Sequence, residues 1–415
     1  MKFKQYFSAV FFLTSIMANY SIPAFAFDAS QQLLYEGSYA ISKGKLDHTL
    51  TLNIDYFQEI SDDIFLQGDL VIRTTSKEYG QPFIVGPNEL YLSTYDIVEN
   101  LDLKAGKIIT RWGAADLFSP LDNFNPMPPG MTLSKKQGKL GALGISASYY
   151  MNDLTYLQAV LMPELKTTPY PVQYLKDSYL AQYQTIYQAQ GLNINTVELA
   201  YQSAENVIWG IRLNHSFPSF DAAISYYRGY FMDPFPVSLT TTPNLLGTTL
   251  EVILGFPVKQ VLGLEFQGEF PGIEGATLRG DFAYIIPESW EFLNNQILEN
   301  PYFQAVISAD YTTDSNLYLN SGFIYGLPFE KGKNCSPFLY LNAKQELENC
   351  DFTPSYVGIL SLNDMSMGNA IGLDYQISEN VAASLSYVFL LGDSESKLGI
   401  LESSRGIYFS LEWLF

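Results

Sequence analysis

The chain has 415 residues, of which 43 are acidic and 23 basic, and its formal net charge is −20. Charged residues make up 16% of the sequence, below the roughly 25% of an average soluble domain, while 30 Tyr and 28 Phe keep the aromatic content high. Few charges and many aromatics exclude a disordered chain, and the acidic balance argues against a nucleic-acid partner. Two Cys and two His are too few for a metal-cluster or zinc-finger protein.

Residues 1–26 have the pattern of a secretory signal peptide. Two early lysines, Lys2 and Lys4, are followed by an apolar stretch and by a small-x-small cleavage triplet at 24–26. The apolar stretch is shorter than the ~20 residues of a membrane-spanning helix. We therefore expect the protein to be exported through the inner membrane, with a single domain over residues 27–415.

Most of the remaining sequence alternates between apolar and polar residues with a period of two. In the segment 46–56, for example, Leu52 and Ile54 share one face, and Asn53 and Asp55 share the other. Such alternation gives a β-strand one apolar and one polar face. The segments run about ten to thirteen residues, close to the nine to eleven that cross a bilayer when tilted. Strands of soluble proteins are usually shorter.

We therefore predict an all-β fold, a transmembrane antiparallel β-barrel of about 16 strands (range about 14–18). Closure pairs every backbone N–H and C=O, which strands in hydrocarbon require. A soluble sandwich or propeller is the alternative, but no internal repeat of fixed period supports it. The convincing segments start near residues 46, 63, 87, 100, 139, 154, 205, 219, 246, 259, 275, 301, 316, 368, 380 and 404, and weaker ones start near 34, 194 and 356.

The C-terminal residues sharpen the prediction of a membrane barrel. Ile407, Phe409, Leu411, Trp413 and Phe415 fall on one face of a terminal strand. This pattern resembles the closing strand of Gram-negative outer-membrane proteins, whose terminal Phe is read by the barrel assembly machinery. The resemblance implies the outer membrane as the location, with its lipids and the assembly machinery as partners.

A long connection over residues 111–139 contains many Pro, Gly and aromatic residues. Its Pro and Gly content disfavours regular structure, and its aromatics make a fully solvated loop unfavourable. We expect either a constriction loop that folds into the lumen or a loop that packs outside it. Trp112, Asp122, Asn125 and Pro126 are the candidate residues of the constriction loop.

The same region carries a family resemblance. A strand-like stretch at 104–113 ends in Trp-Gly and is followed by a Pro-x-Asp-x-x-Asn-Pro loop at 120–126. This pattern is similar to the outer-membrane family labelled domain of unknown function 1302, which is related in style to alginate-export porins. The resemblance covers about residues 100–415 and implies a barrel with passive or facilitated transport. Asp281 departs from the pattern, because the family commonly has Glu after its Arg-Gly pair.

Two further segments contribute smaller predictions. A second long connection at 164–200 contains a possible helix over residues 174–187, with a packing role. Cys335 and Cys350 most simply form a disulfide that closes a surface loop, a bond worth about 3 kcal/mol at this spacing.

The motifs of enzymes are not found. The sequence has no Ser-His-Asp order, nucleophile elbow, zinc motif or phosphate loop. We therefore predict no catalytic residue, no metal and no cofactor, and no enzyme activity. A barrel enzyme with residues scattered over its loops is the alternative.

If the apolar face points to lipid, the polar face lines a lumen. In that lining acids outnumber bases, and acidic rings favour cations. We predict a porin or channel for small hydrophilic solutes with a modest cation preference; the alternative is a plugged surface barrel that acts in adhesion or structure through its outer loops. The candidate pore-lining residues are Arg73, Asp69, Lys104, Arg111, Arg212, Glu265, Glu269, Arg279 and Asp281.

Overall fold

The computed structural model describes residues 28–41, 44–77, 83–127, 138–170, 172–245, 247–292, 295–347 and 350–415. The predicted signal peptide lies outside the described residues, as do residues 128–137 of the predicted constriction loop.

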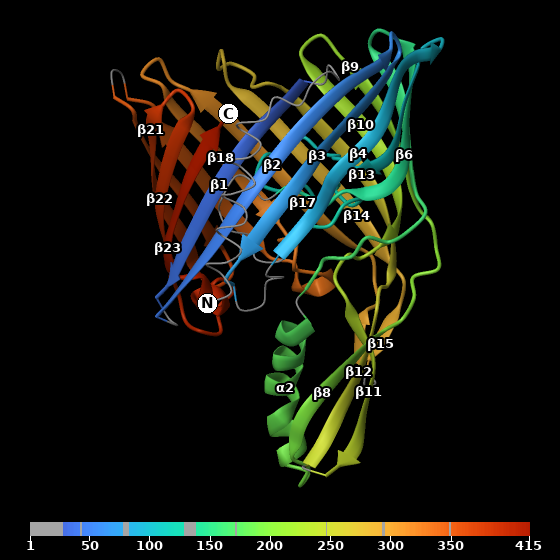
Figure 1. Cartoon of the computed structure of the whole chain (residues 1–415), viewed down its shortest axis with the longest axis vertical. Coiled ribbons are helices and arrows are strands. Elements are labelled where there is room, and N and C mark those ends of the chain that lie inside the picture. The colour runs from blue at the N-terminus through green and yellow to red at the C-terminus, as the bar shows by residue number, and fades with distance from the viewer. Residues whose placement is uncertain are drawn as a thin grey trace, which may run out of the picture.

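Eighteen strands form one closed antiparallel sheet (Figure 1). The first strand, β1 (Asp28–Ala40), closes the barrel against the last, β23 (Gly406–Leu414). The strands between them are, in barrel order, β2 (Lys45–Ser61), β3 (Ile64–Thr75), β4 (Phe83–Val98), β5 (Leu101–Ile108), β6 (Ala142–Asn152), β7 (Thr155–Met162), β9 (Ile208–Ser216), β10 (Phe220–Tyr230), β13 (Val258–Glu269), β14 (Thr277–Pro287), β17 (Tyr302–Thr312), β18 (Leu317–Tyr325), β19 (Pro337–Gln345), β20 (Phe352–Ser361), β21 (Met367–Ser378) and β22 (Val381–Leu391). The predicted all-β antiparallel barrel is confirmed, with a strand number at the upper limit of the predicted range.

The two ends of the barrel differ in their connections. Short turns such as 62–63 and 379–380 join the strands at one end, which we call the short-turn end, and Phe415 lies toward this end. At the other end, the long-loop end, the connections include 163–207 and 231–257. Figure 1 shows the long-loop end at the bottom.

The polar face of the wall points inward and the apolar face outward. Glu265 and Asp281 are register partners on β13 and β14, and their side chains are only 4% and 0% exposed. Leu262 and Leu264 alternate with Glu265 along β13 and are 48% and 47% exposed. This arrangement reverses that of a soluble barrel and places the apolar side chains where lipid tails would cover them.

A separate small unit extends from the long-loop end (Figure 1). It consists of helix α2 (Val172–Gln188) and a sheet of β8 (Ile194–Tyr201), β11 (Phe235–Asn244) and β12 (Gly247–Gly255), in which β8 and β12 are parallel. Tyr183 of the helix packs against Val197, Leu250 and Leu254 of the sheet, so that this extension has its own apolar core. The short hairpin of β15 (Trp290–Phe292) and β16 (Asn295–Leu298) also lies at this end. The remaining elements are the 3-10 turns η1 (Gly332–Asn334) and η2 (Gly399–Ser404). In the part of the chain that the structure describes, no helix is both long and apolar enough to cross a membrane.

The sequence pattern misassigned part of this arrangement. The segment starting near 246 is a strand, but it belongs to the extension, where Leu250 and Leu254 face a helix rather than lipid. The weak segments near 34 and 356 are the barrel strands β1 and β20. Strand β19 was missed because its inward residues Phe338 and Tyr340 are apolar and pack inside the barrel, so that its two faces do not differ in polarity. The helix predicted at 174–187 matches α2.

The predicted disulfide is wrong, because Cys335 and Cys350 are both free thiols. The two cysteines flank β19, which has nine residues and so a length of about 30 Å. A disulfide requires Cα atoms roughly 4.4–6.8 Å apart. Cys335 therefore lies at the long-loop end and Cys350 at the short-turn end, out of reach of each other.

Candidate functional site

Residues 109–127 between β5 and β6 fold into the barrel and pack against its inner wall; we call them the inner loop. The ring of Trp112 packs edge-on against Phe124, with ring centroids 4.8 Å apart, and Phe124 packs in the same way against Tyr227 of β10 at 5.1 Å. The indole N–H of Trp112 donates to Oε1 of Gln158 on β7 at 2.8 Å. Large aromatic side chains thus hold the loop against the β7–β10 wall.

Carboxylates of the wall hold the tip of the inner loop. The backbone N–H of Gly113 donates to Glu265 at 2.8 Å, and those of Ala114 and Ala115 donate to the two carboxylate oxygens of Asp281 at 2.8 and 3.0 Å. Hydrogen bonds to an ionised group are stronger than neutral ones. Gly113 has a φ of +102°, and a Cβ there would collide with Ser119 and with Asp281 itself. The glycine of the Trp-Gly pair is therefore required by this anchoring.

The rest of the tip, residues 115–118, contacts side chains of β14 and β18. Asp116 forms an ion pair with Arg279 and accepts a hydrogen bond from the side chain of Asn320 at 2.8 Å. Ala115 and Phe118 pack against an apolar cluster beneath the other long loops, whose members are Val306, Ile324, Leu327, Phe338, Tyr340 and Leu398. The inner loop therefore extends across the interior from β5 to β18.

Asn125 and Pro126 close the base of the inner loop. The side chain of Asn125 accepts from the N–H of Thr110 at 2.8 Å and donates to the carbonyls of Ile108 and Leu140 at 3.0 and 2.9 Å. The carbonyl of Pro126 accepts from the N–H of Leu140 at 2.9 Å. One amide thus ties the outgoing and returning ends together, which explains the Asn-Pro spacing.

A buried ion pair lies beside this base. Asp122 and Lys139 form a salt bridge with side chains 16% and 4% exposed. Burial raises the pKa of Asp122 and lowers that of Lys139, and the opposite charge of each partner opposes both shifts. Removing one partner would leave an uncompensated buried charge, so the pair fixes the conformation of the loop.

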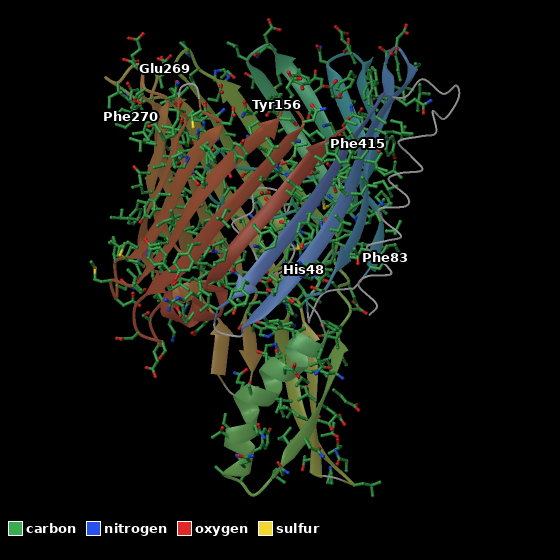
Figure 2. All side chains as sticks on the ribbon, turned by 60° about the vertical axis from the view of Figure 1, so that its left-hand side comes forward. His48, Phe83, Tyr156, Glu269, Phe270 and Phe415 are labelled. Carbon is green, nitrogen blue, oxygen red and sulfur yellow. The ribbon has the colours of Figure 1, made fainter. Side chains whose placement is uncertain are left out.

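The structure divides the nine predicted pore-lining residues into four that hold the wall and the inner loop together and five for which the described residues show no such contact. Arg212 forms an ion pair with Glu265, while Asp281 and Arg279 bind the inner loop, so these four residues are structural anchors. Arg73 and Lys104 lie on β3 and β5, away from those anchors. Three predicted residues complete the set: Asp69 on β3, Arg111 exposed at the start of the inner loop and Glu269 toward the short-turn rim (Figure 2).

A row of acids crosses the inner wall on neighbouring strands. Asp55 of β2 is the direct register partner of Asp69 on β3, and Asp69 is that of Glu89 on β4. Like charges directly opposite each other destabilise a sheet. The sequence pattern missed Glu89 because a register shift beside Asp69 breaks the two-residue alternation. The inward-facing partners Gln158 and Asn320 also carried no sequence signal that would distinguish them from other polar strand residues.

On this side the inner loop contacts the wall where the N–H of Ile109 donates to Oε1 of Glu89 at 2.8 Å. Inward-facing Ser355, Asp374, Ser384 and Glu412 of β20 to β23 remain partly exposed to solvent, in contrast to buried Glu265 on the loop side. The candidate site is therefore the part of the lumen between the inner loop and the sector from β20 through β1 to β4. Among the described residues, no group of three or more His, Cys, Asp or Glu could hold a metal ion.

Neither a protein-family model nor a curated protein matches the chain. Its structural neighbours are outer-membrane porins. Pseudomonas aeruginosa OccK2 in complex with glucuronate is 9% identical, with a TM-score of 0.55 over 94% of this chain and 97% of that one. Pseudomonas aeruginosa OccK5 is 9% identical, with a TM-score of 0.54 over 94% and 97%. Acinetobacter baumannii OccAB3 is 8% identical, with a TM-score of 0.53 over 94% and 98%.

At these identities the comparisons establish the fold. The chain has the fold of a porin-like barrel, an eighteen-stranded wall with a loop folded into its interior. The finer resemblance to the family labelled domain of unknown function 1302 stays a prediction, since no family model matches.

Proposed function

We propose that the protein is an outer-membrane channel through which small hydrophilic solutes diffuse, with a modest preference for cations. The observation that carries this proposal is the partly solvated sector of the lumen beside the inner loop, crossed by the acidic row of Asp55, Asp69 and Glu89. Acidic side chains in a water-filled passage attract cations and repel anions. The inner loop is the constriction of this channel.

The location in the outer membrane is supported by three features. The outward face of the wall is apolar, the N-terminal sequence has the pattern of an export signal, and the chain ends in an aromatic strand. Phe415 pairs with Gln31 through backbone hydrogen bonds of 2.9 and 3.0 Å, and its ring packs against Trp413 at 5.0 Å. In the assembled barrel this closing strand is paired with β1, so any recognition by the assembly machinery precedes closure.

The acidic row also bears on the class of solute. OccK2, which shares the fold, was crystallised with glucuronate, an acidic sugar. Asp55, Asp69 and Glu89 would repel such an anion in this channel. Arg73 and Lys104 lie on the same side and limit the preference to a modest one, because they offset part of the negative potential.

Permeation through liposomes tests this proposal. Reconstituted protein should admit arginine faster than glucose, and glucose faster than glucuronate. One charge acting across ~10 Å of water changes the energy of a monovalent ion by ~0.4 kcal/mol, about twofold in rate. Asp55→Asn should therefore lower arginine uptake and raise glucuronate uptake by about twofold each, which narrows the ratio of the two rates by about fourfold. Glu198→Gln, which removes an exposed acid from the extension, is the matched control and should leave the ratio unchanged.

A surface role is the second candidate, and the extension favours it. Helix α2 and the sheet of β8, β11 and β12 form a folded unit with its own core beyond the mouth of the barrel. A channel does not need such a unit, whereas an adhesive or structural barrel would present one to a partner. Deletion of residues 172–201 and 235–255, each bridged by a Gly-Ser linker, separates the two roles. A channel should keep its permeation without the extension.

A further inference from the structure

Two charged side chains occupy outward-facing positions on the long-loop half of the described wall, Lys107 and Arg228. Arg228 points outward because its neighbour Tyr227 packs against Phe124 of the inner loop. The Nζ of Lys107 donates to the backbone carbonyl of Pro87. Arg228 has no hydrogen bond or ion pair through its side chain to any residue that the structure describes. Its guanidinium is thus available to a ligand from outside the barrel.

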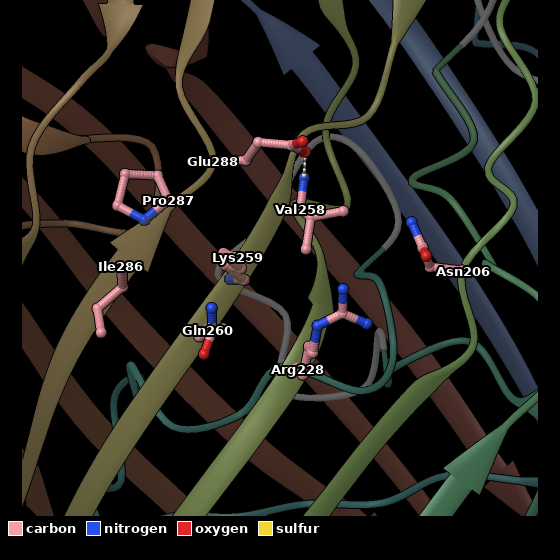
Figure 3. Close-up of a pocket in the computed structure, with 8 residues that line it drawn as sticks. All are labelled: Asn206, Arg228, Val258, Lys259, Gln260, Ile286, Pro287 and Glu288. Atoms are coloured by element: carbon pink, nitrogen blue, oxygen red, sulfur yellow. Dashed lines mark hydrogen bonds between the residues drawn. The ribbon is translucent and has the colours of Figure 1, made fainter.

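Arg228 borders a cavity on the outer surface of the wall. The cavity has a volume of about 440 Å³ and is lined by residues of β10, β13, β14 and the segment before β9 (Figure 3). Gln260 lies opposite Arg228 in the register of β10 and β13 and shares its outward face. The hydroxyl of Tyr226 donates to Oε1 of Gln260 at 2.7 Å, which leaves the amide nitrogen to donate into the cavity. Asn206 contributes a second amide at the edge.

The position of this cavity across the membrane matches the interface between the hydrocarbon core and the lipid headgroups. The outward-facing rings of Trp209 and Tyr226 pack against each other beside Arg228, at 5.2 Å between centroids. Trp and Tyr concentrate where the lipid headgroups begin. An Arg on the lipid face costs ~2–4 kcal/mol at the midplane but only ~0–1 kcal/mol near the interface. Arg228 therefore lies where a headgroup can reach it.

One acid also lines the cavity. A carboxylate oxygen of Glu288 accepts from the N–H of Val258 at 3.3 Å, and Figure 3 shows this group at the margin, away from the guanidinium of Arg228. In the same view the guanidinium of Arg228 lies between the amides of Gln260 and Asn206, which also line the cavity. A planar guanidinium with two nearby amides matches the acceptor oxygens of a phosphate better than a single ammonium would.

We propose that this cavity binds a phosphate group carried by a glycolipid of the outer leaflet, with Arg228 as its principal ligand and Gln260 and Asn206 as further donors. This inference rests on the proposed location in the outer membrane, but it does not depend on conduction. A bound lipid at β10 and β13 would lie on the outside of the wall that carries the inner-loop anchors Tyr227 and Glu265.

Native mass spectrometry of the full-length barrel in detergent tests the site. The probes are lipid A with two phosphates, the same lipid after enzymatic removal of its phosphates, and inorganic phosphate. We expect wild-type protein to retain the phosphorylated lipid and Arg228→Gln to bind it about tenfold more weakly, because a charge-assisted contact is lost. Lys333→Gln, which removes an exposed base from another long loop, should bind as the wild type does.

Three outcomes would overturn the assignment of Arg228 as a phosphate ligand. They are equal binding by Arg228→Gln and wild type, equal retention of the dephosphorylated lipid, and a loss of binding in Lys333→Gln as large as in Arg228→Gln. Inorganic phosphate that binds Arg228 at the lipid's concentration would identify a free anion as the source and overturn the lipid assignment. A heat-resistant barrel band on a gel shows that Arg228→Gln is folded whether or not it conducts, so failure of this site is distinguished from failure of the channel.

Discussion

The anchoring of the inner loop gives the most direct prediction about the lumen. In Asp281→Asn one carboxylate oxygen becomes an NH2 group that faces a backbone N–H, and the charge on the other acceptor is lost. Asp281 accepts from Ala114 and Ala115 at 2.8 and 3.0 Å and is fully buried. Hydrogen bonds to charged groups contribute ~1.5–3 kcal/mol each. We expect a loss of about 3 kcal/mol, or about 100-fold in the equilibrium between the docked and released tip.

Single-channel recording in a planar bilayer measures this shift. Asp281→Asn should show a larger mean conductance and frequent steps between levels, since the released tip of residues 113–119 no longer narrows the lumen steadily. Asp374→Asn removes an inward acid for which no contact with the inner loop is observed, so it should keep the steady conductance of the wild type. Gly113→Ala should reproduce the noisy channel from the loop side, because its Cβ would collide with Asp281. Steady traces of wild-type size from both Asp281→Asn and Gly113→Ala would refute this reasoning.

Three further predictions concern the long loops, the turn at Cys350 and the extension. Both Cys335 and Cys350 should react with a maleimide without prior reduction, because both are free thiols. Cys335 should react more slowly and gain rate at alkaline pH, because burial raises its pKa to about 11. An intact-protein mass without added maleimide would contradict this prediction. Asp364 lies in the loop of residues 362–366, where the N–H of Lys397 and the hydroxyl of Ser366 donate to its carboxylate and hold its pKa well below the usual range. The ionised carboxylate therefore stabilises this loop above about pH 4. That stabilisation is lost as the pH falls through the lowered pKa. Hydrogen exchange of residues 362–366 should show that acid sensitivity in the wild type and not in Asp364→Asn. Leu250→Ala should cost the extension ~2–5 kcal/mol and expose it to proteolysis, while the heat-resistant barrel band on a gel stays unchanged.

The sequence was informative where a residue's environment follows from strand periodicity. Alternation along segments such as 259–269 predicts both the strand and its two faces, because lipid on one side and a polar interior on the other impose opposite preferences. The same rule fails for β19, where Phe338 and Tyr340 pack against loops inside the barrel. It also fails for β12, whose alternation is directed at a helix.

The inner loop shows a second limit of sequence reasoning. Its Pro, Gly and aromatic content predicts a packed irregular segment, and the candidates Trp112 and Asn125 belong to the Trp-Gly and Asn-Pro pattern of that segment. Their partners were not predictable, because Gln158 and Asp281 lie far away in the sequence and resemble any other polar residue facing the interior. The assignment of Asp281 and Arg279 as pore lining rather than loop anchors has the same cause. Only the folded loop distinguishes these two roles.

The central claim is that an open, acid-lined passage remains beside the inner loop. The measurement that tests it most directly is the reversal potential of single channels of the mature protein across a potassium chloride gradient. We predict a stable open channel whose reversal potential has the sign of a modest cation preference, reduced when Asp55 and Asp69 are neutralised together. Folded protein that conducts no current, or a channel that prefers chloride, would contradict the account.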